Sequence, residues 1–501
     1  MDAVFDLPRV DFHAFGPEIV LVVVLGVLLL VDLVFEERAR WASSTIAGIG
    51  LLAALVPVLT LAVAGDDRSL FGGAYVVDNF ALVLKGLFLV AGYVTVLIST
   101  DYIGEGDYYE GEYYFMLLSS LLGMTVMASA RDLLSIFVAL ELLSIPAYLL
   151  AGWRKRDLRG NEASLKYYLL GVFASAVMLY GMSLVFGVAG STLLSRIGDA
   201  VSAGPRSAPV ITVGIVFVVV GFAFKVSAVP FHTWAPDTYE GAPTPITAFL
   251  SVASKAAGFV ALVQLVFIGF LGRDDVWAPM FWLLAALTMT VGNLIALRQT
   301  NLVRLLAYSS VAQAGFMLAP FAVAADIPAA RGGTGGAVGS VVTYLLIYSA
   351  MNLGAFAVVM AVARKTRSGE ISSYGGLFQY APGLTVLMSI FLFALAGIPP
   401  LAGWYAKFVV FKSLLDAGTT AAIALAVVGV VNSVVALFYY ASVAREMWMS
   451  PVPEGQDLTA VRVPPALGAS LALCAAATLA IGVAPNLIAR LGDVALFGTL
   501  P

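Results

Sequence analysis

The sequence predicts an all-α protein that crosses a membrane many times. Of its 501 residues, 61% are hydrophobic and only 12% are charged, and long apolar runs alternate with short charged connections, as in polytopic membrane proteins. Proline residues interrupt two of the apolar runs, which predicts that two of the membrane spans are broken helices.

Runs of about 20 apolar residues define the expected spans. We expect fourteen, near residues 18–35, 42–64, 78–100, 112–129, 132–150, 163–188, 210–240, 244–271, 277–297, 302–324, 337–364, 382–417, 421–448 and 464–489. The seventh and the twelfth are the broken ones. The first span is expected to be retained, because the residues before it carry acids and a single Arg9 instead of the basic segment of a cleavable signal peptide.

The residue types exclude several classes of function. The chain has one cysteine, Cys474, and two histidines, His13 and His232, which are too few for an iron–sulfur cluster. A bis-histidine haem would need His13, which lies outside the expected spans. A glycine-rich phosphate loop and a basic patch for nucleic acid are also missing from the sequence. We therefore expect no cofactor or metal in this chain and no nucleic-acid partner.

The charges of the connections predict the orientation, because Lys and Arg concentrate in cytoplasmic loops. The loop after the fifth span reads GWRKRDLRGN and the loop after the eleventh reads ARKTRSGE, whereas the loops after the third and seventh spans have no Lys or Arg. Most positive charge falls in the loops after spans 1, 5, 9, 11 and 13. Both termini are therefore predicted on the outer side of a bacterial cell (inner) membrane.

The two broken spans read AFKVSAVPFHTWAPD around Pro230 and LAGIPPLAGWYAKF around Pro399 and Pro400. Proline removes a backbone donor and clashes with the preceding turn. The carbonyl groups freed in this way are tolerated in a membrane only where they face protein or a watery cavity. A packing kink is the alternative interpretation of either break alone.

The two breaks belong to an internal repeat. Pro230 and Pro399 are 169 positions apart, and the same shift places 132–150 over 301–319 without a gap. This shift advances the chain by five spans, an odd number, so the two copies must point in opposite directions, as in many transporters. We expect helices 1–3 in residues 1–110, the first inverted repeat (helices 4–8) in 111–275, the second (helices 9–13) in 276–449, and helix 14 in 450–501.

Four ionisable residues lie inside apolar spans: Glu141, Lys225, Lys255 and Lys407. Each such group costs roughly 2.5–3.5 kcal/mol at membrane depth, so a function is expected for it. Arginine stays protonated, whereas a lysine removed from water can exchange its proton near neutral pH. A carboxylate beside a lysine would keep both groups ionised. These residues are therefore the candidate proton carriers.

Static roles are the alternatives. The charged groups could form fixed ion pairs that set helix register, and Ser251 and Ser254 could simply hydrate Lys255. His232 follows the first break and could relay a proton or only satisfy freed carbonyl groups. The other charged residues near span ends are expected to extend toward the interface: Lys85, Lys166, Lys412 and Asp32.

Four segments resemble a known family: FKVSAVPFHTWAPDTYEGAPTPITAFLSVASKAAGF (224–259), LLSIFVALELLSIPAYLLAGW, RLLAYSSVAQAGFML and GIPPLAGWYAKF. They are similar to the antiporter-like subunits of respiratory complex I, above all to the subunit N family of the bacterial proton-translocating NADH-quinone oxidoreductase. The resemblance covers nearly the whole chain, and the DTYEGAPTP run is the segment most specific for subunit N.

The resemblance implies a role for each buried charge. Glu141 matches the glutamate of span 5, Lys225 the lysine that pairs with it, Lys255 the central lysine of span 8, and Lys407 the lysine of the second half-channel. A lysine at 407 fits subunit N better than subunit M, which has glutamate there. Relatives often have histidine where this chain has Gln313, so the link between Lys255 and Lys407 would run through water or hydroxyl groups such as those of Ser309, Ser310 and Tyr308.

The implied function is proton translocation by a membrane-arm subunit, driven by electron transfer from NADH to quinone in other chains that hold FMN and iron–sulfur clusters. The implied partners are the antiporter-like subunits M and L, the small subunits K, J, A and H, the peripheral arm and lipid. Two alternatives remain: a subunit of a multi-subunit sodium/proton antiporter, and a structural scaffold whose buried charges dock neighbouring subunits.

We predict that the Glu141→Ala variant assembles but loses most proton pumping and coupled NADH-to-quinone turnover, because Lys225 loses its counter-ion. Glu141→Gln should behave similarly, and Glu141→Asp should retain part of the activity. Proton uptake and NADH oxidation in proteoliposomes that contain the whole complex measure both effects. Pumping at the wild-type rate by the alanine variant would show that the carboxylate is structural.

Overall fold

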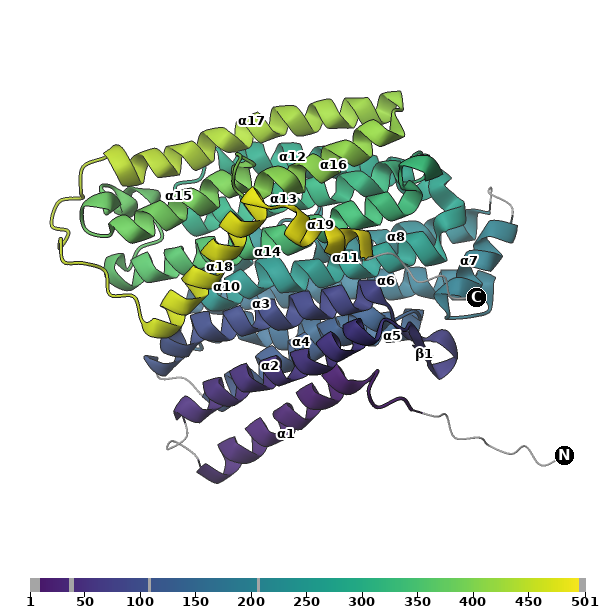
Figure 1. Cartoon of the computed structure of the whole chain (residues 1–501), viewed down its shortest axis with the longest axis horizontal. Helices are drawn as coiled ribbons and strands as arrows, with labels where there is room; N and C mark the ends of the chain where they lie inside the picture. The colour runs from purple at the N-terminus through teal and green to yellow at the C-terminus, as the bar shows by residue number, and fades with distance from the viewer. Residues whose placement is uncertain (1–9, 36–39, 107–109, 205–207, 495–501) are drawn as a thin grey trace.

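The computed structural model describes residues 10–35, 40–106, 110–204 and 208–494 and shows a bundle of long, roughly parallel helices (Figure 1). Connections between helices gather at two opposite ends of the bundle. We call one of them the hairpin end, because it holds a β-hairpin and helix α7 (Leu194–Ala203). The other is the basic-loop end, which holds the connections 152–157 and 367–381.

The N-terminal part forms three spans and the hairpin. The spans are α1 (Gly16–Phe35), α2 (Arg40–Ala64) and α3 (Asn79–Gly104), and the strands are β1 (Arg68–Leu70) and β2 (Tyr75–Val77). The strands pair antiparallel between α2 and α3. Asp78 ends the hairpin and begins α3, because its carboxylate accepts a hydrogen bond from the Ala81 amide at 2.7 Å. The sequence analysis did not predict this hairpin.

The remaining elements follow in two groups. Spans 4 to 8 comprise α4 (Glu110–Ser129), α5 (Leu133–Ala151), α6 (Leu158–Ala189), α8 (Pro209–Lys225), α9 (Trp234–Gly241), α10 (Thr244–Phe249) and α11 (Lys255–Gln264), with π-helical turns at Leu250–Ser254 and Leu265–Gly269. Spans 9 to 14 comprise α12 (Asp274–Ala296), α13 (Leu302–Val323), α14 (Gly333–Thr366), α15 (Pro382–Ala396), α16 (Gly403–Ala417), α17 (Thr420–Met449), α18 (Pro465–Val483) and α19 (Asn486–Val494).

All fourteen expected spans are helical. In the described part of the chain, 11 helical segments are long and apolar enough to cross a membrane. Helix α4 stands where the fourth span is expected, and Glu112, Tyr113 and Tyr114 lower its hydropathy. The two broken spans supply the rest, since each begins with a shorter apolar helix, α8 or α15. The prediction of an all-α membrane protein is confirmed, with the small hairpin as an addition.

Both predicted breaks are present. In span 7, α8 ends at Lys225 and α9 begins at Trp234, and in span 12, α15 ends at Ala396 and α16 begins at Gly403. The predicted proline residues lie in these gaps, where the chain leaves helical conformation. The second half of span 7 runs to the basic-loop end, whereas the second half of span 12 runs to the hairpin end (Figure 1).

Two helix N-termini repeat at the predicted spacing of 169 residues. The carboxylate of Asp132 begins α5 by accepting hydrogen bonds from the amides two and three residues later, and the side chain of Asn301 begins α13 in the same way. Such side chains satisfy amides that have no partner inside the helix. This correspondence supports the inverted repeat, whose domain boundaries stay a prediction.

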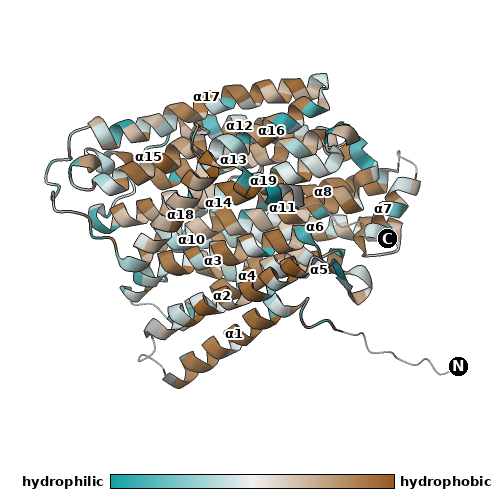
Figure 2. Cartoon of the chain, viewed as in Figure 1, coloured by the Kyte–Doolittle hydropathy of each residue, from teal (hydrophilic) through white to brown (hydrophobic). Residues whose placement is uncertain are grey.

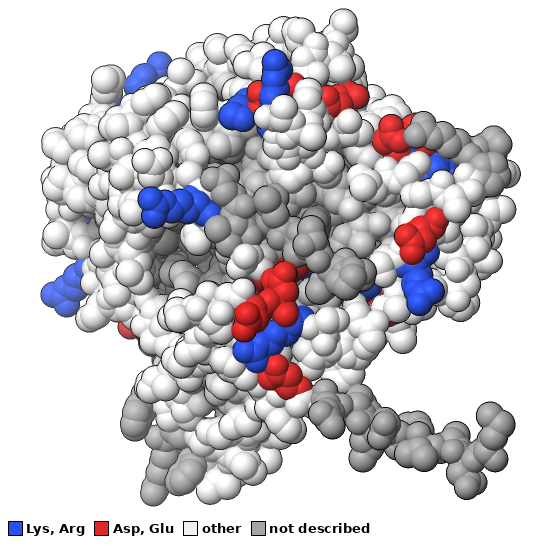
Figure 3. Space-filling model, turned by 45° about the vertical axis from the view of Figure 1, so that its right-hand side comes forward, with Lys and Arg blue, Asp and Glu red and all other residues white. Residues whose placement is uncertain are grey.

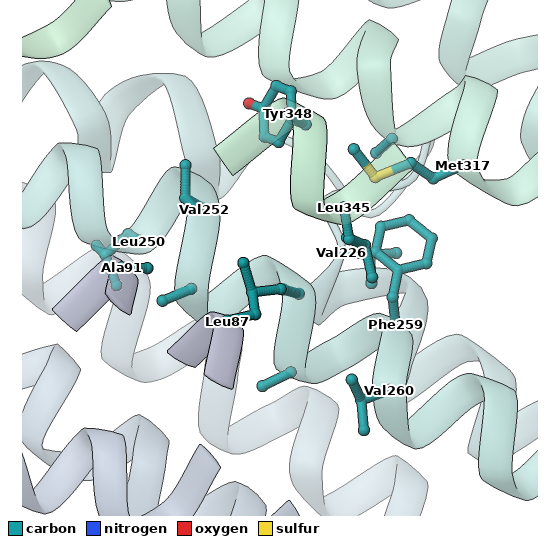
Figure 4. Packing of buried hydrophobic residues seen from close by; sticks show 14 of the residues in the cluster. Leu87, Ala91, Val226, Leu250, Val252, Phe259, Val260, Met317, Leu345 and Tyr348 are labelled. Atoms are coloured by element: carbon teal, nitrogen blue, oxygen red, sulfur yellow. The ribbon is translucent and has the colours of Figure 1, made fainter. Parts of the chain in front are cut away.

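Spans 8 and 11 form the centre of the bundle. The apolar window of Thr244–Gly269 is 100% buried, and that of Ala329–Thr366 is 89% buried, which explains why both helices are apolar on every face. Figure 4 shows Leu87 and Ala91 of α3 close to residues of span 8, against which α3 packs. The outer helices turn apolar faces outward, as Figure 2 shows for α1 and α17.

Lys85 corrects one expectation, because it does not extend to the interface. Its side chain is fully buried, and its ammonium group lies 2.8 Å from Oε1 of Glu18 on α1. It also donates a hydrogen bond to the Tyr75 hydroxyl at 2.6 Å. The sequence could not reveal this pair, because Glu18 is 67 positions away and the hairpin that brings Tyr75 was not predicted. Lys412 and Lys166 do lie near the surface, in ion pairs with Asp416 and Glu162.

We predict that Glu18→Ala destabilises the chain by about 3–5 kcal/mol, because it leaves the buried Lys85 ammonium without a counter-ion. Thermal unfolding of the purified complex and the amount of assembled chain measure the effect. The double variant Glu18→Leu with Lys85→Met should recover most of the loss. Glu162→Ala is the control, since it breaks a half-exposed pair worth at most about 1 kcal/mol. Equal stability of the Glu18 and Glu162 variants would contradict the assignment.

Candidate functional site: a row of buried lysines

Lys225 is the last residue of α8, at the edge of the first break. Only 4% of its surface is exposed, and its ammonium group donates to the Ser144 hydroxyl at 2.9 Å and to the Tyr167 hydroxyl at 3.5 Å. The Tyr167 ring stacks on Trp234, the first residue of α9, with ring centroids 4.5 Å apart. The two halves of span 7 therefore both surround this lysine.

Glu141 lies on α5, one helical turn before Ser144, so both side chains occupy the same face of the helix. Its Oε1 atom is buried and, among the described residues, has no hydrogen-bond partner. The direct ion pair with Lys225 that the resemblance implies is not formed among the described residues. The lysine instead donates to the Ser144 hydroxyl, one turn further along α5.

Lys255 lies at the centre of the bundle. It directly follows the π-helical turn Leu250–Ser254, and such turns often mark functional positions because they shift the register of the side chains that follow. Its side chain is 2% exposed. The ammonium group donates to the backbone carbonyl of Ser310 at 2.8 Å and also to the Ser310 hydroxyl. Ser251, expected as a hydrating group, instead accepts a hydrogen bond from Asn352.

Lys407 lies on α16, just after the second break. Its side chain is 6% exposed, and its ammonium group donates to the Ala396 carbonyl at 2.7 Å and to the Ser433 hydroxyl at 3.2 Å. The Phe316 ring lies 4.9 Å from the same nitrogen and adds a cation–π contact. Ala396 is the last residue of α15, so the break itself provides the acceptor for this lysine.

Gln313 links the surroundings of Lys255 and Lys407. Its amide nitrogen donates to the Leu395 carbonyl at 3.0 Å and to the Tyr440 hydroxyl at 3.3 Å, and its oxygen accepts from Tyr344. The Tyr440 hydroxyl also bonds to Ser309, which neighbours the serine that holds Lys255. Leu395 precedes the carbonyl group that holds Lys407. Side chains and backbone of α13, α15 and α17 therefore connect the two lysines.

His232 lies in the first break and is mostly buried. Its Nδ1 atom has no hydrogen-bond partner within the described residues. Its ring centroid is 6.4 Å from that of Tyr308, and among the described residues no hydrogen bond joins it to a lysine of the row. The structure thus brings Lys225, Lys255 and Lys407 into one buried row and leaves His232 beside it.

Sequence reasoning identified the charged members of the site and missed neutral ones. Ser309 and Ser310 were foreseen as hydroxyl links, whereas the hydroxyl groups of Tyr344 and Tyr440 were not, and Tyr308 does not join the chain of contacts. The available signal was a polar side chain near the middle of an apolar span, as in the LFYYAS segment. That signal is weak, because tyrosine is also common at membrane interfaces.

The three lysines have an unusual electrostatic environment. Each ammonium group is buried, and its hydrogen bonds go to neutral oxygens rather than to carboxylates. A buried charge without a close counter-ion is unfavourable unless the group can release its proton. The arrangement is therefore suited to groups that exchange protons.

Gly397 makes room for Lys407. Its backbone has φ +92°, which favours glycine, and a Cβ atom there would lie 2.8 Å from Cδ of Lys407. We predict that Gly397→Ala costs about 1–2 kcal/mol from backbone conformation alone and lowers proton pumping by displacing the ammonium group from the Ala396 carbonyl. Pumping per assembled complex is the measurement. Gly383→Ala on the same helix is the control, because a Cβ atom there meets open space; equal pumping by both variants would refute the prediction.

The chain is similar to known membrane subunits along nearly its whole length. Residues 130–434 match the family described as NADH:quinone oxidoreductase/Mrp antiporter, transmembrane. The chain is 40% identical over 489 residues to NADH-quinone oxidoreductase subunit N of Trichlorobacter lovleyi, covering 97% of each chain. It is 43% identical over 487 residues to subunit N 2 of Rhizobium meliloti, covering 96% of this chain and 97% of the relative.

Solved structures agree with the sequence comparison. A chain of respiratory complex I from Thermus thermophilus with bound aureothin is 31% identical, with a TM-score of 0.76 and coverage of 95% of this chain and 98% of that chain. A chain of the Mrp complex from Dietzia has a TM-score of 0.82, with 97% of each chain covered, but only 21% identity, so it shows the fold alone. The length and identity of these matches lead to one assignment: the chain belongs to the subunit N family of the NADH-quinone oxidoreductases.

Proposed function

We propose that the chain moves protons along the row of Lys225, Lys255 and Lys407, between half-channels that open to opposite ends of the bundle. Family membership makes it a proton-translocating membrane-arm subunit of an NADH-quinone oxidoreductase. The observation that carries the route is a set of hydrogen bonds between Lys255 and Lys407, which runs through Ser309, Tyr440 and Gln313 and is joined by the peptide links 309–310 and 395–396.

The first half-channel leads from the basic-loop end to Lys225. Helix α9, the second half of span 7, points to that end, and His232 lies in the break beside it. The Tyr167 hydroxyl contacts Lys225 and interacts with Ser254, the residue before Lys255. Protonated Lys225 is stabilised when Glu141 approaches and releases its proton when the two separate, as they are here.

The second half-channel leads from Lys407 to the hairpin end. Helix α16, the second half of span 12, points to that end, and a cavity of about 380 Å³ lies along it. The cavity is lined by Arg331, Ser340, Tyr405, Lys412 and Asp416, among other residues. These polar side chains support a watery exit, because water occupies cavities only where it finds polar partners.

The distribution of charged side chains over the two ends of the bundle supports an orientation in the membrane. Arginine and lysine side chains concentrate in the connections of the basic-loop end, such as 152–157 and 364–367. On the face that Figure 3 turns forward, several basic side chains lie next to acidic ones. We therefore place the basic-loop end in the cytoplasm and both termini on the outer side of a bacterial cell membrane. The loop after span 1, at 36–39, lies outside the described residues.

The partners and cofactors follow from the family. We propose that the chain packs beside antiporter-like subunits M and L and the small subunits K, J, A and H, through its exposed apolar faces and bound lipid. FMN, iron–sulfur clusters, NADH and quinone act in other chains of the complex, including the peripheral arm. Electron transfer there supplies the free energy for the proton movement here.

The antiporter and scaffold alternatives have less support. A fold shared with the Mrp complex does not distinguish the functions, whereas 40% identity to subunit N over nearly the full length favours the oxidoreductase. A pure scaffold would not need three buried lysines that lack close carboxylate partners. A buried lysine with a static role, such as Lys85, has a carboxylate in direct contact, here that of Glu18.

The route predicts different outcomes for two substitutions of Gln313. Gln313→His should keep most pumping, because imidazole can both donate and accept hydrogen bonds. Gln313→Leu should impair it, since the Leu395 carbonyl and Tyr344 hydroxyl would lose their partner, at a cost of about 1–3 kcal/mol each, and water would be excluded. Protons translocated per NADH oxidised, measured in proteoliposomes, report the effect.

The matched control is Gln264→Leu. Gln264 is another buried amide, but it donates to the carbonyl groups of Met127 and Ala128, away from the route between Lys255 and Lys407. Its loss should lower stability and leave the pumping ratio of the assembled complex unchanged. Normal pumping by Gln313→Leu would show that protons take another path.

A further inference from the structure

A second polar cavity lies at the basic-loop end, in the second repeat, where neither the half-channel at Lys225 nor the exit at Lys407 uses it. It has a volume of about 530 Å³ and lies between the ends of α12 and α17, the start of α13 and the segment 370–372. Its walls carry the hydroxyl groups of Thr300, Ser372 and Ser442. We name it the α17 cavity.

Charged groups surround the α17 cavity. Glu370, Arg445 and Glu446 line it, and Glu446 accepts a hydrogen bond from Ser450 at 2.7 Å. Carboxylates at the surface of a cavity attract protons from the solution and raise their local concentration. Polar walls of this kind also retain water, which an apolar cavity of the same size would not.

The inner end of the α17 cavity reaches the proton route. Tyr439 lines the cavity, is 3% exposed, and lies ten residues before the end of α17, a depth of about 15 Å at the helical rise. Its ring is 4.4 Å from that of Tyr440, between centroids, and its hydroxyl donates to Oδ1 of Asn293 at 3.0 Å. Tyr440 bonds directly to Ser309 and Gln313, the groups that connect Lys255 with Lys407.

We propose that the α17 cavity is a second proton intake, which delivers protons from the basic-loop end to the Gln313 region without passing Lys225. The Tyr439 hydroxyl turns from Asn293 toward Tyr440, and a proton from cavity water adds to the Tyr439 oxygen as the proton that this hydroxyl carried passes to the Tyr440 oxygen. The Tyr440 proton passes at the same time to the Ser309 oxygen, whose own proton moves on to water beside Gln313. Each oxygen gains one proton and loses one, and rotation of the hydroxyl groups returns them to their starting positions. The second repeat then has both an intake and an exit of its own.

The inference rests on the proposed route through Gln313, and the two can be tested apart. If Gln313→Leu pumps normally, the route itself is wrong. If Gln313→Leu is impaired while the α17 cavity can be blocked without effect, only the second intake is wrong.

The first experiment removes one hydroxyl group. In the whole complex in proteoliposomes, Tyr439→Phe should lower the protons translocated per NADH oxidised while electron transfer from NADH to an artificial acceptor in the peripheral arm stays normal. The ring and its packing are retained, so the loss would be specific to the hydroxyl. Tyr374→Phe is the control, because Tyr374 is also buried at this end and its hydroxyl has no partner among the described residues.

The second experiment blocks the α17 cavity after assembly, so a folding defect cannot explain the result. A membrane-impermeant, charged thiol reagent added on the basic-loop side should lower pumping by Ser442→Cys. It should leave Met449→Cys unaffected, since Met449 is exposed at the end of α17 but does not line the cavity. The natural Cys474 is buried, and wild-type complex treated with the reagent corrects for cysteines in other subunits.

A wild-type proton ratio in Tyr439→Phe, together with unchanged pumping by labelled Ser442→Cys, would overturn the second intake. Combining Tyr439→Phe with Lys225→Ala tests whether the two intakes act independently. If the α17 cavity supplies protons independently, the Lys225 variant retains part of its pumping, and adding Tyr439→Phe removes that part. Complete loss in Lys225→Ala alone would also overturn the proposal.

Discussion

The burial of three ammonium groups without close carboxylate partners is the constraint on which the rest of the structure depends. A charge in a low-dielectric interior must be neutralised, bonded or released. Here each lysine finds neutral oxygens: the Ser144 hydroxyl for Lys225, Ser310 for Lys255, and the Ala396 carbonyl for Lys407. The two serines lie on regular helices, whereas the break after α15 frees the Ala396 carbonyl.

Two pairs of the same residue types show how environment separates structure from function. Lys85 and Glu18 are buried and in direct contact, and Lys85 also donates a hydrogen bond to Tyr75. Each charge stabilises the other, so both residues are expected to stay ionised. Lys225 and Glu141 lie on facing helices but are separated, and the serine between them holds the ammonium group. A pair that can close and open can change the proton affinity of its lysine, whereas a permanently closed pair can only hold helices together.

The inverted arrangement gives the row a direction. Span 7 continues from its break to the basic-loop end, and span 12 continues from its break to the hairpin end, as the proposed half-channels require. Gln313 lies between them and is held by three helices at once, which makes it a fixed junction rather than a mobile carrier. Polar cavities lie at both ends of the second repeat, one lined by Tyr439 of α17 and the other by Tyr405 of α16.

The sequence by itself determined the membrane class, the fourteen spans, the two proline breaks and the charged members of the row, because hydropathy, proline and intramembrane charge act locally along the chain. The spacing of 169 residues also indicated the repeat. Only the tertiary structure decided which groups meet: the separation of Glu141 from Lys225, the burial of Lys85 against Glu18, and the junction of Gln313 with Tyr344 and Tyr440. Contacts between spans that are distant in sequence depend on helix rotation and depth, and neither quantity is encoded in the composition of a single span.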